Sequence, residues 1–232
     1  MDYYKKYLKY KSKYLELLNQ NNQVGGGNKL VIHISGPSGA GKTTLGNKLK
    51  EKFGNKIVVK DIDDLRAEYV EKKYGSYQKL WKIKNFVWDK ESYQQWIDDY
   101  VDKQTKPLVF VGLNHMPWWN KKLYYNMHSS YNFYIKLDSD VIFKQKCDRF
   151  INDVFIKNKE AVLNDIIKNE KNTIDDISNG LKHECGYNEI VKMNNTWNKD
   201  YKKQGYKFMT REQIFKKVSV ILTKYHKKME TE

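Results

Sequence analysis

Proline, cysteine and long apolar runs are scarce in this chain of 232 residues. Its two cysteines, Cys147 and Cys185, form no C-x-x-C pair and stand at no Cys/His spacing typical of zinc ligands. The sequence therefore supports neither a disulfide framework nor a zinc site. No run approaches the roughly 18 apolar residues that span a bilayer, and lysines and tyrosines occupy the N-terminus in place of an apolar signal-peptide core. We expect a cytoplasmic protein in a reducing compartment, with no membrane partner.

Arginine is equally rare. Arg66, Arg149 and Arg211 are the arginines among 43 basic residues, which outnumber 28 acidic residues and give a net charge of +15. A charge of this size is compatible with nucleic-acid binding. However, arginine is the side chain that usually binds phosphate and guanine through two hydrogen bonds, and evenly spread lysines with abundant Asn, Ile and Tyr are what an AT-rich coding sequence produces. We favour a solvated lysine surface and keep nucleic acid as the alternative partner.

The N-terminal segment has a pattern of its own. Residues 2–20 place Tyr and Leu at three- and four-residue steps between lysines, which predicts an amphipathic helix. The polar, glycine-rich run over residues 19–29 predicts a flexible linker. We therefore expect a helix with its linker (residues 1–28) and one folded domain (residues 29–232) of a size that suits a single α/β core. The helix either packs loosely on the domain or serves in docking or assembly.

Five short apolar runs in the domain predict strands, at residues 30–35, 57–60, 108–111, 133–137 and 206–209. Helical patterns separate them, among them residues 41–53 and 211–225, and residues 140–203 are mostly helical and polar. Continuous apolar strands alternating with helices predict an α/β fold whose parallel sheet is covered on both faces. In such folds, ligands bind at the carboxyl ends of the strands.

A glycine-rich phosphate loop follows the first predicted strand and opens a helix. It comprises Gly36, Pro37, Ser38, Gly39, Ala40, Gly41, Lys42 and Thr43, a complete G-x-x-x-x-G-K-[ST] pattern, with Thr44 directly after it. The glycines allow the backbone N–H groups to turn inward, and the helix N-terminus adds partial positive charge. We expect Lys42 to reach the β- and γ-phosphates of a nucleoside triphosphate, and Thr43 to ligate Mg²⁺.

The segment GPSGAGKTTL resembles the Walker A loop of P-loop NTPases, and the short chain resembles their nucleoside and nucleotide kinase group over about residues 30–227. We find no LSGGQ-like stretch of ABC ATPases, no apolar run ending in Asp-Glu and no N-K-x-D guanine motif of GTPases. The resemblance implies a three-layer P-loop kinase-like fold with a five-stranded parallel sheet and a helical lid. It further implies ATP and Mg²⁺ as the bound cofactors. The N-terminal residues KYLKYKSKYL resemble a leader found in many proteins of giant nucleocytoplasmic DNA viruses, which implies a viral origin and a location in the host cytoplasm or the virion.

An acidic cluster comes after the second predicted strand. In a parallel sheet, Asp61 and Asp63 emerge beside the phosphate loop, where a carboxylate can position an acceptor hydroxyl and take its proton. We favour Asp63 for this role and for Mg²⁺, with Asp61 as the second candidate. We expect Asp64 to cap the next helix. The run from Asp64 to Ala67 also resembles the D-L-L-R-A step of adenylate kinases, which implies that Arg66 grips a phosphate on the acceptor.

The third strand ends in Val111 and Gly112, whereas an adenylate kinase carries D-G-F-P-R at this point. This departure argues against adenylate kinase activity. His115 follows and is a candidate substrate contact, although a single loop histidine more often forms neutral hydrogen bonds. Trp118 and Trp119 either stack on a base or belong to the packing under a lid.

Arg149 lies in the helix expected after the fourth strand. In the kinase group, that helix leads into a lid whose cations close over the triphosphate and neutralise charge in the transition state. We therefore count Arg149 with Lys42 as a catalytic candidate, and a solvated helix face is its alternative.

These features predict an ATP-dependent kinase that acts on a small acceptor such as a nucleoside, a nucleotide or a similar metabolite. Two other classes stay open. A polynucleotide 5′-hydroxyl kinase has the same loop and carboxylate and makes use of the positive charge. A non-catalytic nucleotide-binding or assembly protein binds ATP without transferring phosphate.

Overall fold

The computed structural model of the protein describes residues 29–115 and 123–231. The expected N-terminal helix and linker (residues 1–28) lie outside the described residues, as do Trp118 and Trp119. Within the described part, no helix is both long and apolar enough to cross a bilayer.

Five parallel strands form one sheet in the order β2-β3-β1-β4-β5. Their bounds are Val31–Ser35 (β1), Val58–Asp61 (β2), Leu108–Val111 (β3), Tyr131–Ile135 (β4) and Lys207–Met209 (β5). In the register, Ile32 pairs with Val109 of β3 and Ile34 with Phe133 of β4. All five strands expected from the sequence are therefore confirmed, with ends that differ by no more than two residues.

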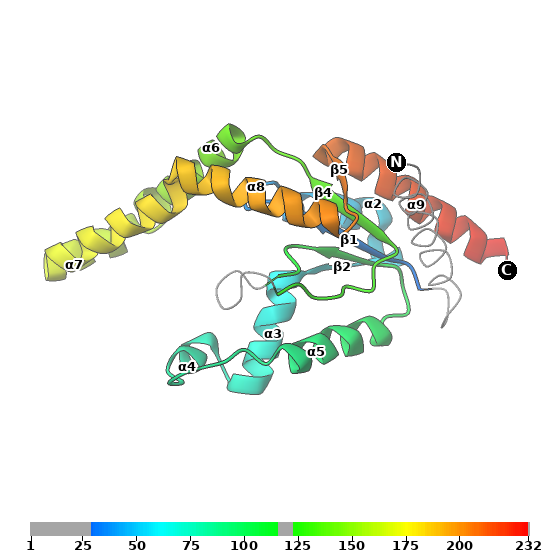
Figure 1. Cartoon of the computed structure of the whole chain (residues 1–232), viewed down its shortest axis with the longest axis horizontal. Helices are drawn as coiled ribbons and strands as arrows, with labels where there is room; N and C mark the ends of the chain where they lie inside the picture. Colours follow the sequence, from blue (N-terminus) through cyan, green and yellow to red (C-terminus); the bar gives the residue numbers. More distant parts are fainter. Residues whose placement is uncertain (1–28, 116–122, 232) are drawn as a thin grey trace, which may run out of the picture.

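Helices connect and follow the strands (Figure 1). They are α2 (Lys42–Phe53), the 3₁₀ turn η1 (Gly54–Lys56), α3 (Ile62–Tyr74), α4 (Tyr77–Trp81), α5 (Lys90–Lys103), α6 (Ser139–Ile151), the π-helical stretch η2 (Asn152–Lys157), α7 (Lys159–Cys185), α8 (Tyr187–Lys203) and α9 (Arg211–Thr231). The backbone of Asn169 is not helical, so α7 is kinked there. The largely helical region predicted for residues 140–203 is confirmed.

The sheet is apolar on both faces, which makes three layers. On one face, Ile32 and Ile34 of β1 pack with Leu45 and Leu49 of α2 and with the buried side of α9. On the other face, β3 residues pack against α3 and α5, where aromatic residues such as Tyr69, Tyr93 and Trp88 fill the core. Tyr134 of β4 and Tyr201 of α8 extend this second face. The expected α/β fold with a parallel sheet covered on both sides is confirmed.

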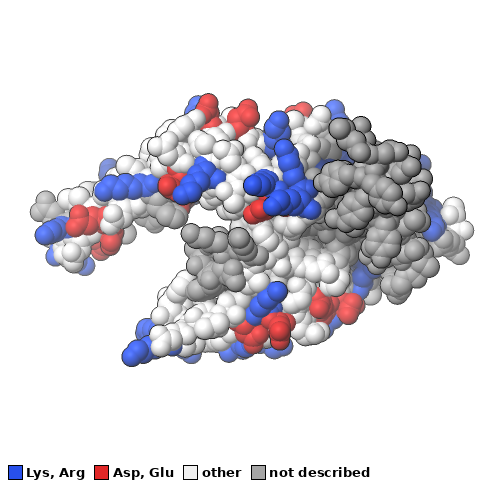
Figure 2. Space-filling view, viewed as in Figure 1, with Lys and Arg blue, Asp and Glu red and all other residues white. Residues whose placement is uncertain are grey.

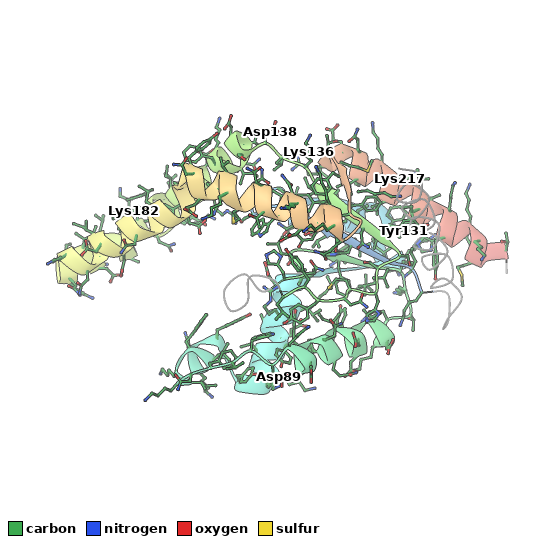
Figure 3. The ribbon with its side chains drawn as sticks, in the orientation of Figure 1. Asp89, Tyr131, Lys136, Asp138, Lys182 and Lys217 are labelled. Atoms are coloured by element: carbon green, nitrogen blue, oxygen red, sulfur yellow. The ribbon has the colours of Figure 1, made fainter. Side chains whose placement is uncertain are left out.

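Helices α6, α7 and α8 form an arm that projects beyond the sheet (Figure 1). Figure 2 shows the surface hollowed between this arm and the layer that contains α3 and α4. Asp138, at the start of α6, and Asp89, which caps α5 by accepting a bond from the Ser92 N–H at 2.9 Å, lie on opposite sides of the sheet (Figure 3). The carboxyl end of β2 leads into α3 and that of β4 leads into α6, the helices on the two sides of this hollow.

The arm brings together the two cysteines, which are far apart in sequence. Lys146 of α6 forms an ion pair with Glu184 of α7 at 3.1 Å, and the next residues along each helix, Cys147 and Cys185, are free cysteines whose thiols lie close together. Burial, with this contact, raises the pKa of Cys147 to about 11. The Cys147 thiol is therefore protonated at neutral pH.

Candidate functional site

The phosphate loop curls between the end of β1 and the start of α2. Gly39 (φ 83°) and Gly41 (φ 74°) adopt left-handed backbone conformations that side chains with a Cβ rarely tolerate. Gly41 is the N-cap of α2 and offers no side-chain cap. The first-turn N–H groups of a long helix are therefore left without a capping acceptor at the loop, which is the usual setting for a bound anion.

Lys42 points back into this loop. Its ammonium group donates to the carbonyl oxygens of Gly36 at 2.9 Å and Pro37 at 2.8 Å. Burial is the largest cause that lowers its pKa to about 8, Arg149 lowers it further, and Asp63 and Asp61 partly offset the shift. A phosphate oxygen in the loop would supply the missing counter-charge, so Lys42 is placed to exchange carbonyl contacts for phosphate contacts.

The lowered pKa predicts a pH dependence of nucleotide binding. Below about pH 8 the free protein already carries protonated Lys42, so Mg·ATP affinity is expected to stay constant between pH 7 and pH 7.5. Above pH 8 the proton must be taken up on binding, and affinity should fall by up to about tenfold per pH unit. Titration by calorimetry from pH 7 to pH 9.5 measures this slope.

The Lys42→Arg variant is the control, because a guanidinium stays protonated throughout this range. Its Mg·ATP affinity, whatever its absolute value, is expected to be flat above pH 8. Equal slopes in the two proteins would assign the pH dependence to another group.

Two arginines flank the loop from different helices. Arg149 of α6 donates from Nη2 to the hydroxyl of Ser38 at 3.2 Å. Arg211, the first residue of α9, lies beside Gly41, where a Cβ added to that glycine would stand 2.6 Å from its Nη1 atom. With Lys42, three cationic side chains thus surround one short loop, an arrangement that favours a ligand with several negative charges.

Arg211 was missed by the sequence analysis. Two features of the sequence could have identified it: the chain has few arginines, and this one stands two residues after a predicted strand and opens a predicted helix. Neither feature says which loop the side chain reaches. That contact depends on β5 lying beside β4 and on the packing of α9 against α2.

Asp61 ends β2 and lies directly against the loop. Its Oδ2 atom accepts a hydrogen bond from the hydroxyl of Thr43 at 3.1 Å, and its Oδ1 atom accepts from the Asp63 N–H at 3.0 Å. Burial raises the pKa of this carboxyl group. The second bond makes Asp61 the N-cap of α3, so the expectation that Asp64 caps this helix is wrong. A capping side chain bonds the N–H two or three residues ahead, and the helix begins earlier than the sequence suggested.

Asp63 lies one step further from the loop and faces solvent. Its side chain is 74% exposed and accepts a hydrogen bond from Nη1 of Arg66 at 2.7 Å. It is also the carboxylate that does most to raise the pKa of Lys42, so its charge lies near the loop lysine. Asp63 is therefore accessible to an incoming acceptor, whereas Asp61 is already engaged by Thr43 and the helix.

Arg66 is buried, with a side chain only 4% exposed. Besides Asp63, its guanidinium donates to the carbonyl oxygens of Leu113 at 3.3 Å and His115 at 3.4 Å. Its Nε atom has no hydrogen-bond partner. These contacts hold α3 to the segment after β3 and fix the position of Asp63, so most of the donors that could grip an acceptor phosphate are already engaged.

His115 is buried among aromatic rings of Tyr124, Trp197 and Tyr201. Its Nδ1 atom lies 3.3 Å from the Tyr201 hydroxyl, and Nε2 has no partner. Burial, with the nearby Arg66, lowers the pKa of His115 to about 4. It is therefore neutral at physiological pH, and its burial makes direct contact with a substrate depend on a rearrangement of its surroundings.

The oxygen atoms of Thr43 and Asp61 suit Mg²⁺, which takes one or two protein ligands and completes its shell with phosphate oxygens and water. Within residues 29–115 and 123–231, no group of three or more His, Cys, Asp or Glu side chains could hold a metal without such help. The geometry thus favours Asp61 over Asp63 as the carboxylate near a bound Mg²⁺.

No protein-family model matches the chain, and no curated protein matches its sequence.

Proposed function

We propose that this chain is an ATP-dependent phosphotransferase of the P-loop kinase type that acts on a small hydroxyl-bearing acceptor. The observation that carries the proposal is the meeting of three groups at one sheet edge: the phosphate loop with Lys42, an accessible carboxylate at Asp63, and two arginines on separate helices. A protein that only bound nucleotide would need the first group alone.

Each residue has a role that follows from its place. The loop amides and Lys42 bind the β- and γ-phosphates. Thr43 and Asp61 would hold Mg²⁺, which would neutralise charge on the phosphates. Arg149 and Arg211 stabilise the negative charge that spreads over the phosphoryl oxygens. Arg149 comes from the arm and Arg211 from α9. Motion of the arm toward the loop would therefore couple closure of the site to catalysis.

Asp63 orients the acceptor hydroxyl and takes its proton as the oxygen attacks the γ-phosphorus; the bond between that phosphorus and the β–γ bridging oxygen breaks, and ADP leaves. Arg66 positions Asp63 through the 2.7 Å bond. This role for Arg66 replaces a direct grip on the acceptor, since its guanidinium is mostly engaged within the protein. The site therefore favours an acceptor whose reacting end is a neutral hydroxyl, such as a nucleoside or a sugar-like metabolite, over a nucleoside monophosphate.

A panel of acceptors tests the proposal. The purified full chain is incubated with Mg·ATP and, in turn, nucleosides, nucleoside monophosphates, sugars and 5′-hydroxyl oligonucleotides, and ADP release is measured. Acceptor-dependent ADP release with a nucleoside or sugar is expected. ATP binding without ADP release from any acceptor would contradict the proposal and favour a nucleotide-binding assembly protein. Release with oligonucleotides alone would identify a polynucleotide kinase.

A further inference from the structure

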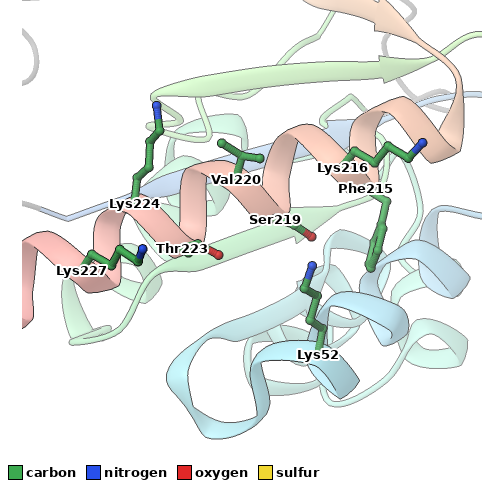
Figure 4. A pocket seen from close by; sticks show the side chains of 8 residues that line it. All are labelled: Lys52, Phe215, Lys216, Ser219, Val220, Thr223, Lys224 and Lys227. Atoms are coloured by element: carbon green, nitrogen blue, oxygen red, sulfur yellow. The ribbon is translucent and has the colours of Figure 1, made fainter.

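A groove of about 490 Å³ lies on the side of the molecule formed by α2 and α9 (Figure 4). Lys52, near the end of α2, forms one wall, and α9 provides the rest. The lining residues are Lys52, Phe215, Lys216, Ser219, Val220, Thr223, Lys224 and Lys227. None of them belongs to the phosphate loop or to the acidic cluster, so the groove is separate from the proposed active site.

Positive charge dominates this groove. Four of its lining side chains are lysines, and none is a carboxylate. Among the described residues, these four lysines form no ion pair; Glu230, near the end of α9, pairs instead with Lys56 at 3.8 Å. Unpaired ammonium groups that face one groove repel each other, and a bound polyanion relieves that repulsion.

The base of the groove carries an unused hydrogen-bonding group. Ser219 is 4% exposed, and its hydroxyl has no hydrogen-bond partner in the structure. Figure 4 shows its oxygen directed from α9 toward the side where Lys52 lies. Buried hydroxyl groups are normally bonded, so Ser219 points to a ligand with an acceptor oxygen at this position.

The groove is not purely polar. The ring of Phe215 and the side chain of Val220, which is 52% exposed, form apolar parts of its lining. The ammonium of Lys52 lies 5.3 Å from the centre of the Phe215 ring. A ligand that alternates anionic groups with flat or apolar groups matches this lining better than a simple inorganic anion does.

The spacing of the lysines indicates how long an anion must be to contact all of them. Lys216 and Lys227 are eleven residues apart on one straight run of helix, which places them about 16 Å apart along the axis. A single phosphate cannot contact both. A chain of phosphates, each a few ångströms from the next, meets all of them in succession.

We propose that this groove binds the sugar–phosphate backbone of a single-stranded nucleic acid. The lysines contact successive phosphates, Ser219 donates to a phosphate oxygen, and Phe215 and Val220 contact the exposed bases or sugars. A duplex buries its bases and offers nothing to the apolar lining, which favours a single strand. Lys182 lies on the distant arm (Figure 3) and, like Lys217, does not line this groove.

Fluorescence anisotropy of a labelled single-stranded 12-mer with the full chain tests this proposal. The slope of log K against log salt for single strands is about −0.7 per neutralised phosphate, so four lysine contacts predict a slope near −3. The K216Q/K224Q/K227Q variant should bind at least about tenfold more weakly at low salt, with a slope near −0.7.

The matched control is K90Q/K103Q/K106Q, which removes the same charge from exposed positions in and just after α5. It should keep the affinity and slope of the unmodified chain, and Lys42→Ala should do so as well because the phosphate loop takes no part. Equal losses in the two triple variants would overturn the proposal and reduce the binding to net charge. Absence of binding at low salt, or equal affinity for a duplex of the same length, would overturn it too.

Discussion

Replacing Asp63 with Asn is expected to lower turnover by about 10²–10⁴-fold while Mg·ATP affinity changes little. The amide keeps the size of the side chain and can still accept a bond from Arg66, but it cannot take the proton of the acceptor hydroxyl. Because the Asp63 side chain is exposed, the substitution should not disturb the fold. Steady-state kinetics with the acceptor identified by the panel measure the effect, and calorimetry measures nucleotide affinity.

Asp64→Asn is the matched control for this experiment. Asp64 is also exposed, stands next in sequence and loses the same charge, but no hydrogen bond or ion pair of its side chain is found within the described residues. It should retain nearly full turnover. If Asp63→Asn stays active while Asp61→Asn does not, the proton acceptor is Asp61, and the roles proposed for the two carboxylates are reversed.

Replacing Lys42 with Ala is expected to abolish most of the stabilisation that Mg·ATP gives the protein. A ligand at a hundredfold excess over its Kd stabilises the native state by about 2.7 kcal/mol, which corresponds to a rise in Tm of about 5–11 °C for a chain of this size. Without the ammonium group, the loop loses its main contact to the β- and γ-phosphates, so the shift should nearly vanish. Thermal denaturation with and without Mg·ATP measures it.

Lys48→Ala controls for the loss of a lysine from the same helix. Lys48 is exposed on α2, about one and two-thirds turns after Lys42, and its replacement should leave the nucleotide shift intact. The Tm without nucleotide separates binding from folding, because Lys42 also bonds two loop carbonyls. Equal nucleotide shifts in Lys42→Ala and the unmodified chain would refute the assignment of the phosphate site.

The residues on the acceptor side of the site show the largest difference between the roles expected from the sequence and the contacts found in the structure. From the sequence, Asp64 was the expected cap and Arg66 a candidate for binding an acceptor phosphate. In the structure, Asp61 caps α3 and contacts Thr43, and Arg66 is buried against Asp63 and two carbonyl oxygens. The sequence gives no sign of that burial, because the covering residues come from the segment after β3.

The sequence by itself determined the elements of this protein that depend on neighbours along the chain. Apolar runs of strand length, helical periodicity and the spacing of Gly36, Gly41 and Lys42 are local patterns, and they predicted the five strands, the α/β class and the phosphate loop. Each of these features is set within about ten residues, so no knowledge of the tertiary arrangement was needed.

Only the tertiary structure decided which distant residues meet. The order β2-β3-β1-β4-β5 brings Asp61 to Thr43, and the packing of α6 and α9 brings Arg149 and Arg211 to one loop. The lysine groove likewise needs α9 to lie beside α2. Strand order and helix packing are set by the burial of apolar faces, which is not directional and does not specify a partner in the sequence, so these contacts become visible only once the chain is folded.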